Sequence, residues 1–573
     1  MNMRSGLAVI SVIGAIGLII YGILQPVEGE VRWLLCLWAS APLFGLAAYL
    51  ATRTGETRSL SRNLTNLGLV FLVGFGLISL QLLRQQFVRA SAIAMHVVQD
   101  EEGQAISNIR PVLASQRVLR GEIRDMREIV LVQSEPVGNA ARRVYPLADR
   151  YDPRAFSNIV GFFSTRYGQS GLEATYNAYL SGERGNEWQR LRDSLLSETP
   201  RGNHLTLTLN ADLQAEAAAA LGGRTGSVVV LDPRTGAIRA LVSNPGFDPR
   251  GLSFNPGAAD REAENDRITQ YWQEIQMESA GQPLLNRTTQ GLYPPGSVFK
   301  TITAIGVLEH SGVGQPGTIT CPETYLPQPD APPIVNAVSG LHSLTGDPSD
   351  LERVYAFSCN TAFAQYATRL GAERMVETAG RFDIGTPQRM TTTYRGLSDL
   401  LANQSLLYRD AGFLNQPRAL ADTGYGQGQL LVTPLQMALV AAAIANDGIM
   451  MQPYLVQTVT RPDGGRILTH TPQRIRRTMS SATAQTMLNN MSAVARYGFG
   501  QSISSFVPGI AVGGKSGTAE HVAGASPHAW FIAVAPLDAP RYAVAVMVER
   551  GGEGSSVGAE LAGRVLTAAF ATE

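Results

Sequence analysis

The 573-residue sequence predicts a mixed α/β fold of the α+β type: an antiparallel sheet covered by helices, preceded by a small pedestal and by transmembrane helices. Three observations lead to this prediction. Apolar strand-like segments form hairpin patterns at both ends of the C-terminal part, Ala-rich helical segments fill the sequence between them, and long uncharged stretches occupy the N-terminus. Strands at both ends of a domain indicate one sheet that both ends complete, with helices on its two faces.

The N-terminal region contains three stretches without Asp, Glu, Lys or Arg, namely Gly6–Leu24, Trp33–Ala51 and Leu67–Leu83. As helices with a rise of about 1.5 Å per residue, they approach the ~30 Å thickness of a hydrocarbon core. We therefore expect three transmembrane helices, at about 6–24, 33–51 and 67–83. A cleaved signal peptide is the alternative for the first stretch, but no small-x-small cleavage site precedes Glu28.

The charges between these stretches predict their orientation. The second connection carries Arg53, Arg58 and Arg62, whereas the first carries Glu28 and Glu30 against a single arginine. The positive-inside rule then places the N-terminus and the second connection in the cytoplasm. Because three crossings export everything that follows, we expect a multi-pass protein of the cytoplasmic (inner) membrane with an extracytoplasmic main domain.

The composition narrows the possible functions. With 47 basic and 47 acidic residues the net charge is zero, which gives no indication of nucleic-acid binding. Cys321 and Cys359 are the only cysteines in the expected exported part, and either a disulfide or two free thiols would suit an oxidising compartment. The seven histidines are scattered and no Cys/His cluster has ligand spacing, so we expect no metal and no cofactor.

We divide the chain into a membrane anchor (1–88), a juxtamembrane pedestal of dimerisation-domain type (89–225) and a main domain (226–573). Residues 84–105 are polar and are expected to form a helix that leaves the membrane. The rest of the pedestal shows a mixed, short-ranged pattern with turn residues throughout.

Two predicted strand pairs bracket the main domain. Ser227–Leu231 and Ile238–Val242 flank Asp-Pro-Arg-Thr-Gly, a strong hairpin signal, and Trp530–Ala535 and Tyr542–Val548 flank a Pro-containing turn. Between them, Ala-rich segments such as Thr433–Asn446 predict helices.

Three short motifs carry the chemistry: Ser297-Val298-Phe299-Lys300, Ser358-Cys359-Asn360 and Lys515-Ser516-Gly517-Thr518. Each occurs by chance in long sequences, but together they supply a nucleophile, a base, a proton relay and an anion-binding cation for acyl transfer. The preceding Pro-Pro-Gly ends any earlier helix, so Ser297 is expected in the first turn of the next helix, with Lys300 one turn along. Burial and the helix N-terminus both disfavour an ammonium there, so Lys300 could act as a neutral base.

The third motif lies in a Gly-rich segment that predicts a strand. Its glycines would let a peptide substrate approach the backbone and pair with it as an added strand. Lys515 supplies positive potential for a substrate carboxylate, and the hydroxyls of Ser516 and Thr518 can bind that carboxylate.

The motif set resembles that of the class B penicillin-binding proteins. The resemblance implies the penicillin-recognising serine transferase (β-lactamase-like) fold over about 226–573, with Ser297 as the acylated nucleophile and Lys300 as its base. Ser358 would relay a proton to the leaving amine, and Asn360 would bind the donor peptide and help to hold Lys300. The backbone N–H groups of Ser297 and Thr518 would form the oxyanion hole, each donor being worth about 2.7–4 kcal/mol in the transition state.

Other strings agree with this family. Arg120–Asp125 is similar to its R-G-x-I-x-D segment and Gly171-Leu172-Glu173 to its G-L-E segment, and both are interpreted as structural. Gly424-Tyr425-Gly426-Gln427-Gly428 is similar to a transpeptidase segment in which Gln427 shapes the wall of the cleft. His521 and His528 follow the third motif, where a structural or rim position is favoured over contact with substrate.

The function implied is that of a peptidoglycan D,D-transpeptidase, which cross-links stem peptides through a Ser297 acyl-enzyme, releases D-Ala and is acylated by β-lactams. No E-x-x-L-N string follows the second motif, which argues against a class A β-lactamase, and no glycan-polymerase string E-D-x-x-F-x-x-H is present. A D,D-carboxypeptidase and a membrane-bound β-lactam sensor or scaffold stay as alternatives. The compact pedestal resembles that of division-type members, and the implied partner is a membrane glycan polymerase of the SEDS type.

Overall fold

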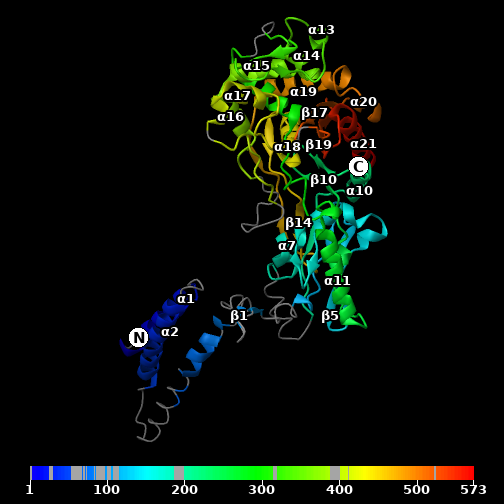
Figure 1. Ribbon diagram of the computed structural model, residues 1–573. Helices are drawn as coiled ribbons and strands as arrows, with labels where there is room; N and C mark the ends of the chain where they lie inside the picture. Colours follow the sequence, from blue (N-terminus) through cyan, green and yellow to red (C-terminus); the bar gives the residue numbers. More distant parts are fainter. Residues whose placement is uncertain are drawn as a thin grey trace, which may run out of the picture. The chain divides into compact units, whose positions relative to one another are not determined.

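Figure 1 shows the computed structural model of the chain, which describes residues 3–24, 30–52, 68, 71, 74–82, 84–85, 97–99, 105–107, 115–185, 199–313, 319–387, 401–410, 412–521 and 524–573. Two compact units are distinguished, Met1–Ser115 and Gln116–Glu573. Each is described by itself.

The first unit contains the predicted membrane anchor. Helices α1 (Met3–Ile23) and α2 (Glu30–Thr52) pack against each other. Among the described residues, one helical stretch, Arg32–Leu50, is long and apolar enough to span a membrane, and Gly6–Gly22 is a shorter apolar helix. Of the expected third span, residues 74–82 are helical, and most of the remainder lies outside the described residues.

The segment that follows corrects one prediction. Strand β1 (Val97–Gln99) pairs antiparallel with β2 (Ala105–Ser107), so the polar helix expected over 84–105 is wrong at these positions. The two consecutive β-branched valines that begin β1 favour extended backbone over helix, which explains the difference.

The pedestal is built on a six-stranded sheet. Its strands, in spatial order, are β15 (Arg466–Thr469), β14 (Val456–Thr460), β8 (His204–Leu207), β3 (Ile123–Arg124), β4 (Val130–Val137) and β5 (Ala140–Val144). Two of them, β14 and β15, come from the middle of the predicted main domain and pair with the pedestal through β8. The pedestal and the main domain therefore share a sheet, and this explains why residues 116–573 form one compact unit.

The main domain contains a five-stranded antiparallel sheet. Its strands, in spatial order, are β10 (Ile238–Asn244), β9 (Gly226–Leu231), β19 (Tyr542–Val548), β18 (His528–Ala535) and β17 (Gly513–Ala519). The hairpin β9–β10 joins the C-terminal strands where β9 pairs with β19. The prediction of one antiparallel sheet completed by both ends of the domain is confirmed.

Helices cover both faces of this sheet. On one face lie α10 (Ala211–Leu221) and α21 (Ala559–Ala571), and on the other lie α18 (Pro434–Ala445), α12 (Lys300–Glu309) and α19 (Ser481–Arg496) (Figure 1). Alternation along β9 divides its side chains between the two cores: Val228 and Val230 face one, Val229 and Leu231 the other. This is the expected consequence of the two-residue period of a strand.

The remaining helices of five or more residues in this unit are α7 (Gly171–Thr175), α11 (Arg261–Gln276), α13 (Leu341–Thr345), α14 (Leu351–Ala356), α15 (Asn360–Leu370), α16 (Ala372–Arg381) and α17 (Pro417–Gly424). Short strands β11 (Thr324–Tyr325) and β12 (Ile334–Val335) pair beside α15. Helices α13 to α17 lie together as one helical lobe (Figure 1), and α12 packs against α15 and α16 of this lobe.

Candidate active site

Ser297 lies where three backbone segments meet. It belongs to a 3₁₀ turn, η7 (Gly296–Phe299), that runs directly into α12, so the expected first helical turn is a 3₁₀ turn. Gly296 has a φ of +56°, and a Cβ there would clash with the Thr518 carbonyl of β17. Gly426, at a φ of +92°, approaches the carbonyl of Gly296 equally closely. Glycine is required at both positions, and the close packing fixes Ser297 against β17.

Lys300 connects the first two motifs. Its Nζ lies 3.1 Å from Ser297 Oγ, 3.0 Å from Ser358 Oγ, 2.6 Å from the Ser358 carbonyl oxygen and 2.7 Å from Asn360 Oδ1. The side chain is fully buried. Burial lowers the pKa of the Lys300 ammonium well below its usual value, and the charge of Lys515 lowers it further. A neutral amine at this position can accept a proton from a neighbouring hydroxyl.

Lys515 connects the second and third motifs. It is also fully buried, and its Nζ donates hydrogen bonds to Ser358 Oγ at 3.0 Å and to the Ser516 carbonyl at 2.8 Å. Burial lowers the pKa of Lys515 to about 7. Ser358 Oγ therefore lies between the two amines, which suits a proton relay.

The surroundings of the two lysines are neutral. Each lysine also lies over an aromatic ring: Lys300 Nζ is 5.6 Å from the ring centroid of Phe363, and Lys515 Nζ is 5.7 Å from that of Tyr355. In the described part of the chain no carboxylate forms an ion pair with either amine. Lys300 and Lys515 are also the only lysines in the sequence, all other basic side chains except histidine being arginines.

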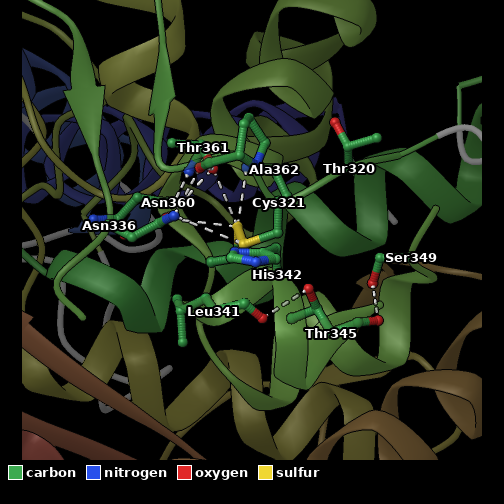
Figure 2. The surroundings of a disulfide bond; sticks show 12 residues. Thr320, Cys321, Asn336, Leu341, His342, Thr345, Ser349, Asn360, Thr361 and Ala362 are labelled. Carbon is green, nitrogen blue, oxygen red and sulfur yellow. Dashed lines mark hydrogen bonds between the residues drawn. A yellow bond between two sulfur atoms is a disulfide. The ribbon is translucent and has the colours of Figure 1, made fainter. Parts of the chain in front are cut away.

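The backbone of the second motif is held in an unusual conformation. Ser358 has a φ of +54°, in the left-handed region that residues other than glycine rarely adopt. The next residue, Cys359, forms a disulfide with Cys321, which resolves the alternative that the sequence left open (Figure 2). The disulfide thus ties the second motif covalently to the loop before β11.

A polar network surrounds this disulfide. Asn336 donates a hydrogen bond from Nδ2 to the Pro322 carbonyl at 2.9 Å and accepts one at Oδ1 from the Thr361 N–H at 3.2 Å (Figure 2). Asn360 donates from Nδ2 to the Val335 carbonyl at 3.0 Å. The β11–β12 segment is therefore held against α15, and Asn360 is oriented with its oxygen toward Lys300.

The third motif lies on an edge strand. Residues 513–519 form β17, whose inner edge pairs with β18 so that Lys515 lies opposite Ile532 and Thr518 opposite Ala529. Its other edge pairs with no strand among the described residues. At Gly517 a Cβ would come within 3.0 Å of the Pro295 carbonyl oxygen, so glycine keeps β17 close to the nucleophile turn.

A cavity of about 730 Å3 lies in front of these motifs. Of the predicted residues, Ser297, Ser358, Asn360, Ser516 and Thr518 line it, while Lys300 and Lys515 lie buried behind their hydroxyl partners. Gly517 contributes backbone close to the nucleophile turn. The three motifs, far apart in sequence, are brought together as predicted.

Sequence reasoning missed several residues of the cavity. Thr518 Oγ1 donates a hydrogen bond to Glu553 Oε2 at 3.1 Å and accepts one from the Gly554 N–H at 3.3 Å. On the opposite wall, Asp422 accepts hydrogen bonds from Arg418 Nε at 2.8 Å and from the Tyr425 hydroxyl at 2.6 Å. Glu553, Arg418 and Asp422 lie in none of the three motifs. The Gly-Gly-Glu-Gly run around position 553 is the one sequence signal that could have pointed to a close backbone approach there.

Two predicted residues lie outside the cavity lining. His521 and His528 stack on each other at 4.1 Å between ring centroids. His528 Nδ1 accepts a hydrogen bond from the Arg550 N–H at 3.1 Å, and burial lowers its pKa to about 4. The pair lies at the C-terminal end of β17 and not among the groups that line the cavity. Gln427, by contrast, does line it.

The two pedestal strings meet in space. Arg120 donates to Glu173 Oε2 at 2.6 Å and Arg143 to Oε1 of the same carboxylate at 2.6 Å, all three side chains being at most 3% exposed. Burial alone would raise the pKa of Glu173, but the two guanidinium groups outweigh it and hold the pKa below its usual value. These strings therefore form a fully charged buried cluster.

Comparison with known proteins places the chain in a family. Residues 226–567 match the penicillin binding protein transpeptidase domain, and residues 120–205 match the penicillin binding protein A dimerisation domain. The protein belongs to the class B penicillin-binding proteins. Peptidoglycan D,D-transpeptidase PbpA of Mycolicibacterium smegmatis is 34% identical over 439 residues, covering 75% of this chain and 83% of the relative. Peptidoglycan D,D-transpeptidase MrdA of Acinetobacter baumannii is 28% identical, covering 68% and 58%.

Solved structures show the same fold. Penicillin-binding protein A from Mycobacterium tuberculosis, as a ceftriaxone acyl-enzyme, superposes with a TM-score of 0.69 at 31% identity, covering 80% of this chain and all of the other. Its imipenem acyl-enzyme gives the same TM-score at 32% identity. The predicted fold and family are confirmed.

Proposed function

We propose that this chain is a monofunctional peptidoglycan D,D-transpeptidase that works through an ester on Ser297. One observation carries the proposal: the buried Lys300 amine lies within hydrogen-bond distance of both Ser297 Oγ and Ser358 Oγ, and no carboxylate of the described residues pairs with it. The names of its relatives, peptidoglycan D,D-transpeptidases, and the β-lactam acyl-enzymes of its structural neighbours agree with this chemistry.

Acylation follows from the positions of these groups. Neutral Lys300 takes the proton from Ser297 Oγ while that oxygen attacks the carbonyl carbon of the penultimate D-Ala of a stem peptide. The N–H groups of Ser297 and Thr518 bind the resulting oxyanion. When the C–N bond breaks, Ser358 passes a proton to the departing amine of the terminal D-Ala and is reprotonated from the lysine side, which leaves an ester on Ser297.

Transfer to the acceptor reverses these roles. The neutral amine of a second stem peptide attacks the ester, its surplus proton passes through Ser358 to Lys300, and Ser297 leaves with a proton from Lys300. A β-lactam opens its ring in the first half of this sequence and retains its amine, so the acceptor site stays obstructed.

We assign the binding roles in the same way. Asn360 and the free edge of β17 align the donor backbone, and Lys515 with the Ser516 and Thr518 hydroxyls binds its terminal carboxylate, Gly517 allowing the close approach. The stem peptides belong to lipid-linked or nascent glycan.

The membrane arrangement is part of the proposal. We assign 1–88 to an anchor with three spans, 89–225 to the pedestal and 226–573 to an extracytoplasmic catalytic domain, and we propose a SEDS-type glycan polymerase as the membrane partner. The apolar stretches and the arginines of the second connection support this topology. Alkaline phosphatase fused after residue 105 should be active, and after residue 60 inactive; the reverse result would refute the orientation.

The chemistry is tested on the full-length protein in detergent. Fluorescent penicillin should add one adduct to the peptide containing Ser297, and Ser297→Ala should abolish it. With a D-Ala-D-Ala stem peptide and a D-amino acid, mass spectrometry should detect exchange of the terminal residue. Hydrolysis without exchange would instead identify a carboxypeptidase, and labelling that survives Ser297→Ala would remove the nucleophile.

A further inference from the structure

The cavity contains a carboxylate at the place assigned to the substrate's own carboxylate. Glu553 lies between the end of β19 and the one-turn segment η9 (Gly554–Gly558), and its Oε2 accepts a hydrogen bond from Thr518 Oγ1 at 3.1 Å. Its side chain is exposed and lines the same cavity as Ser297. Thr518 is thus already bound to an anion before a substrate arrives.

The backbone around Glu553 is closely fitted to β17. The Gly554 N–H donates to Thr518 Oγ1 at 3.3 Å, and a Cβ at Gly554 would clash with the Gly517 carbonyl. Glycines also precede Glu553 at positions 551 and 552, the second with a φ of +84°. This run brings the chain against the third motif, whereas the Glu553 side chain is held there by its single hydrogen bond to Thr518.

We propose that Glu553 determines specificity at this site by competing with the donor carboxylate for Thr518. The inference rests on the proposed role of Lys515 and Thr518 as the carboxylate-binding pair. A ligand that carries a carboxylate must break the Thr518–Glu553 hydrogen bond and displace a like charge, because two carboxylates in contact repel each other. A ligand with no charge at that end lacks the repulsion, so Glu553 slows acidic donors and β-lactams selectively.

A neighbouring carboxylate provides a matched control. Glu520 follows the third motif directly, is exposed and lines the same cavity, but it makes no hydrogen bond or ion pair within the described residues. Glu520→Gln removes the same charge from the same cavity without changing the contact to Thr518. A general electrostatic effect would appear in both variants, and competition for Thr518 only in one.

The experiment measures the second-order rate of Ser297 acylation in full-length wild type, Glu553→Gln and Glu520→Gln. With a fluorescent penicillin, whose carboxylate is free, Glu553→Gln should react about fivefold faster or more, the effect of one unit charge at about 4 Å in water. With the methyl ester of the same penicillin, Glu553→Gln and wild type should react equally. Glu520→Gln should stay within about twofold of wild type for both ligands, since Glu520 makes no hydrogen bond to Thr518 within the described residues and does not compete for it.

Each outcome decides the question. Equal or slower acylation of Glu553→Gln by the free acid overturns the inference, as does a gain that persists with the ester or that Glu520→Gln reproduces. If Glu553→Gln has a lower thermal midpoint than wild type, Glu553→Asp replaces it, because aspartate keeps the charge on a shorter side chain. Its rate of acylation by the free acid should lie between those of wild type and Glu553→Gln. If wild type forms no Ser297 adduct with either ligand, the proposed function fails, which is a different result from equal rates in the two proteins.

Discussion

The pedestal and the candidate active site each bury two basic side chains close to a shared oxygen-bearing group, but the shared group differs. In the pedestal, Arg120 and Arg143 share the carboxylate of Glu173, with nitrogen–oxygen distances of 2.6 Å. In the candidate active site, Lys300 and Lys515 share a hydroxyl, Ser358 Oγ, at 3.0 Å, and neither pairs with a carboxylate in the part of the chain that the structure describes. The first arrangement keeps its charges, and the second lowers the pKa of both cations.

The difference shows how residue type separates structure from chemistry. An arginine cannot give up its proton inside a protein, so burying one requires a fixed anion and yields a fixed scaffold. A lysine buried without an anion has a lowered pKa, so that Lys300 can accept a proton, while Lys515, with a pKa of about 7, is still partly protonated at neutral pH. The chain has only two lysines, and both lie in the candidate active site. Apart from histidines, the other buried basic side chains are therefore arginines.

Replacing Lys300, the proposed base, with arginine, the basic residue of the pedestal cluster, should produce the largest effect. Lys300→Arg places a permanent positive charge at this position and offers no neutral base, so we expect the rate of Ser297 acylation by fluorescent penicillin to fall about 10²–10⁴-fold. Lys300→Met should lose as much activity without a lower thermal midpoint, because it removes a buried group that has no anion. Activity of Lys300→Arg within tenfold of wild type would show that the charge, and not the base, is needed.

Removing the pedestal anion should affect folding and not chemistry. Glu173→Gln leaves two buried guanidinium groups without a carboxylate, and we expect a loss of about 3–5 kcal/mol in the free energy of unfolding. The rate of acylation per folded molecule should stay unchanged. Urea unfolding of the full-length protein in detergent, followed by fluorescent-penicillin labelling of the folded fraction, measures both quantities.

The control is an exposed pair on α21. Glu560→Gln breaks the Arg564–Glu560 contact of 3.0 Å, where the two side chains are 54% and 32% exposed. Such pairs contribute about 0–1 kcal/mol, so this variant should be close to wild type. An equal loss of unfolding free energy in Glu173→Gln and Glu560→Gln would show that the buried cluster contributes no more to stability than an exposed ion pair.

The comparison also predicts opposite responses to pH. Burial lowers the pKa of Lys515 to about 7, whereas an unfolded lysine titrates near 10.4. Between these values the unfolded chain binds more protons than the folded one, so the contribution of Lys515 to the free energy of unfolding rises with pH, by up to about 1.4 kcal/mol per unit. The chain has two lysines and therefore gives two sets of lysine side-chain NMR signals. We expect both to titrate with a pKa well below 10 in the folded protein and near 10.4 in urea.

Lys515→Met provides the matching measurement of stability. The difference in unfolding free energy between wild type and this variant should become more favourable to wild type from pH 7 to pH 10. Glu173 has a lowered pKa and contributes in the acid range instead, its stabilisation being lost as pH falls through its folded pKa. A folded lysine signal that titrates near 10.4 would contradict the account of the site.

The sequence predicted those parts of the fold that local patterns determine. The two strand pairs and the helices between them follow from alternation and turn residues over short distances. The closure of the sheet by β9 and β19 was predicted from a different observation, namely that strands lie at both ends of the domain. The completion of the pedestal sheet by β14 and β15 was not predictable, because the pairing of β14 with β8 joins residues more than 240 positions apart. A polar helix over 84–105 was predicted in the segment where β1 and β2 form. A strand of three residues is too short for its composition to distinguish it from part of a helix.

The same limit applies to the site. Ser297, Lys300, Ser358 and Lys515 were found because their spacing is that of a known motif set, and the disulfide could only be offered as an alternative. Glu553 has no such spacing: it reaches Thr518 only because β17 and β19 lie in one sheet, with β18 between them. Contacts of this kind depend on the fold and become visible after it is known.

A third ion pair, with a buried Arg287 side chain and a Glu549 side chain that is 28% exposed, leads to the smallest effect. Arg287 Nε donates to Glu549 Oε1 at 2.8 Å, as in the pedestal, but the Tyr293 hydroxyl donates to the same oxygen at 2.8 Å. Tyr293 precedes the Pro-Pro-Gly turn that leads to Ser297, and the Pro294 carbonyl accepts a further hydrogen bond from Trp530 Nε1 at 3.0 Å. This pair therefore supports the nucleophile turn without touching substrate.

Tyr293→Phe removes the hydroxyl and leaves Arg287 paired with Glu549. We expect a loss of about 1–2 kcal/mol in the free energy of unfolding, and a fall in acylation rate of less than about tenfold because the turn is less firmly positioned. Tyr542→Phe is the matched control, since its hydroxyl also donates to a carboxylate, that of Glu573, at the far side of the sheet. Tyr542→Phe should lose a similar amount of unfolding free energy and leave the acylation rate unchanged. Equal acylation rates in the two variants would mean that the Arg287–Glu549 pair, like the pedestal cluster, contributes only to the stability of the fold.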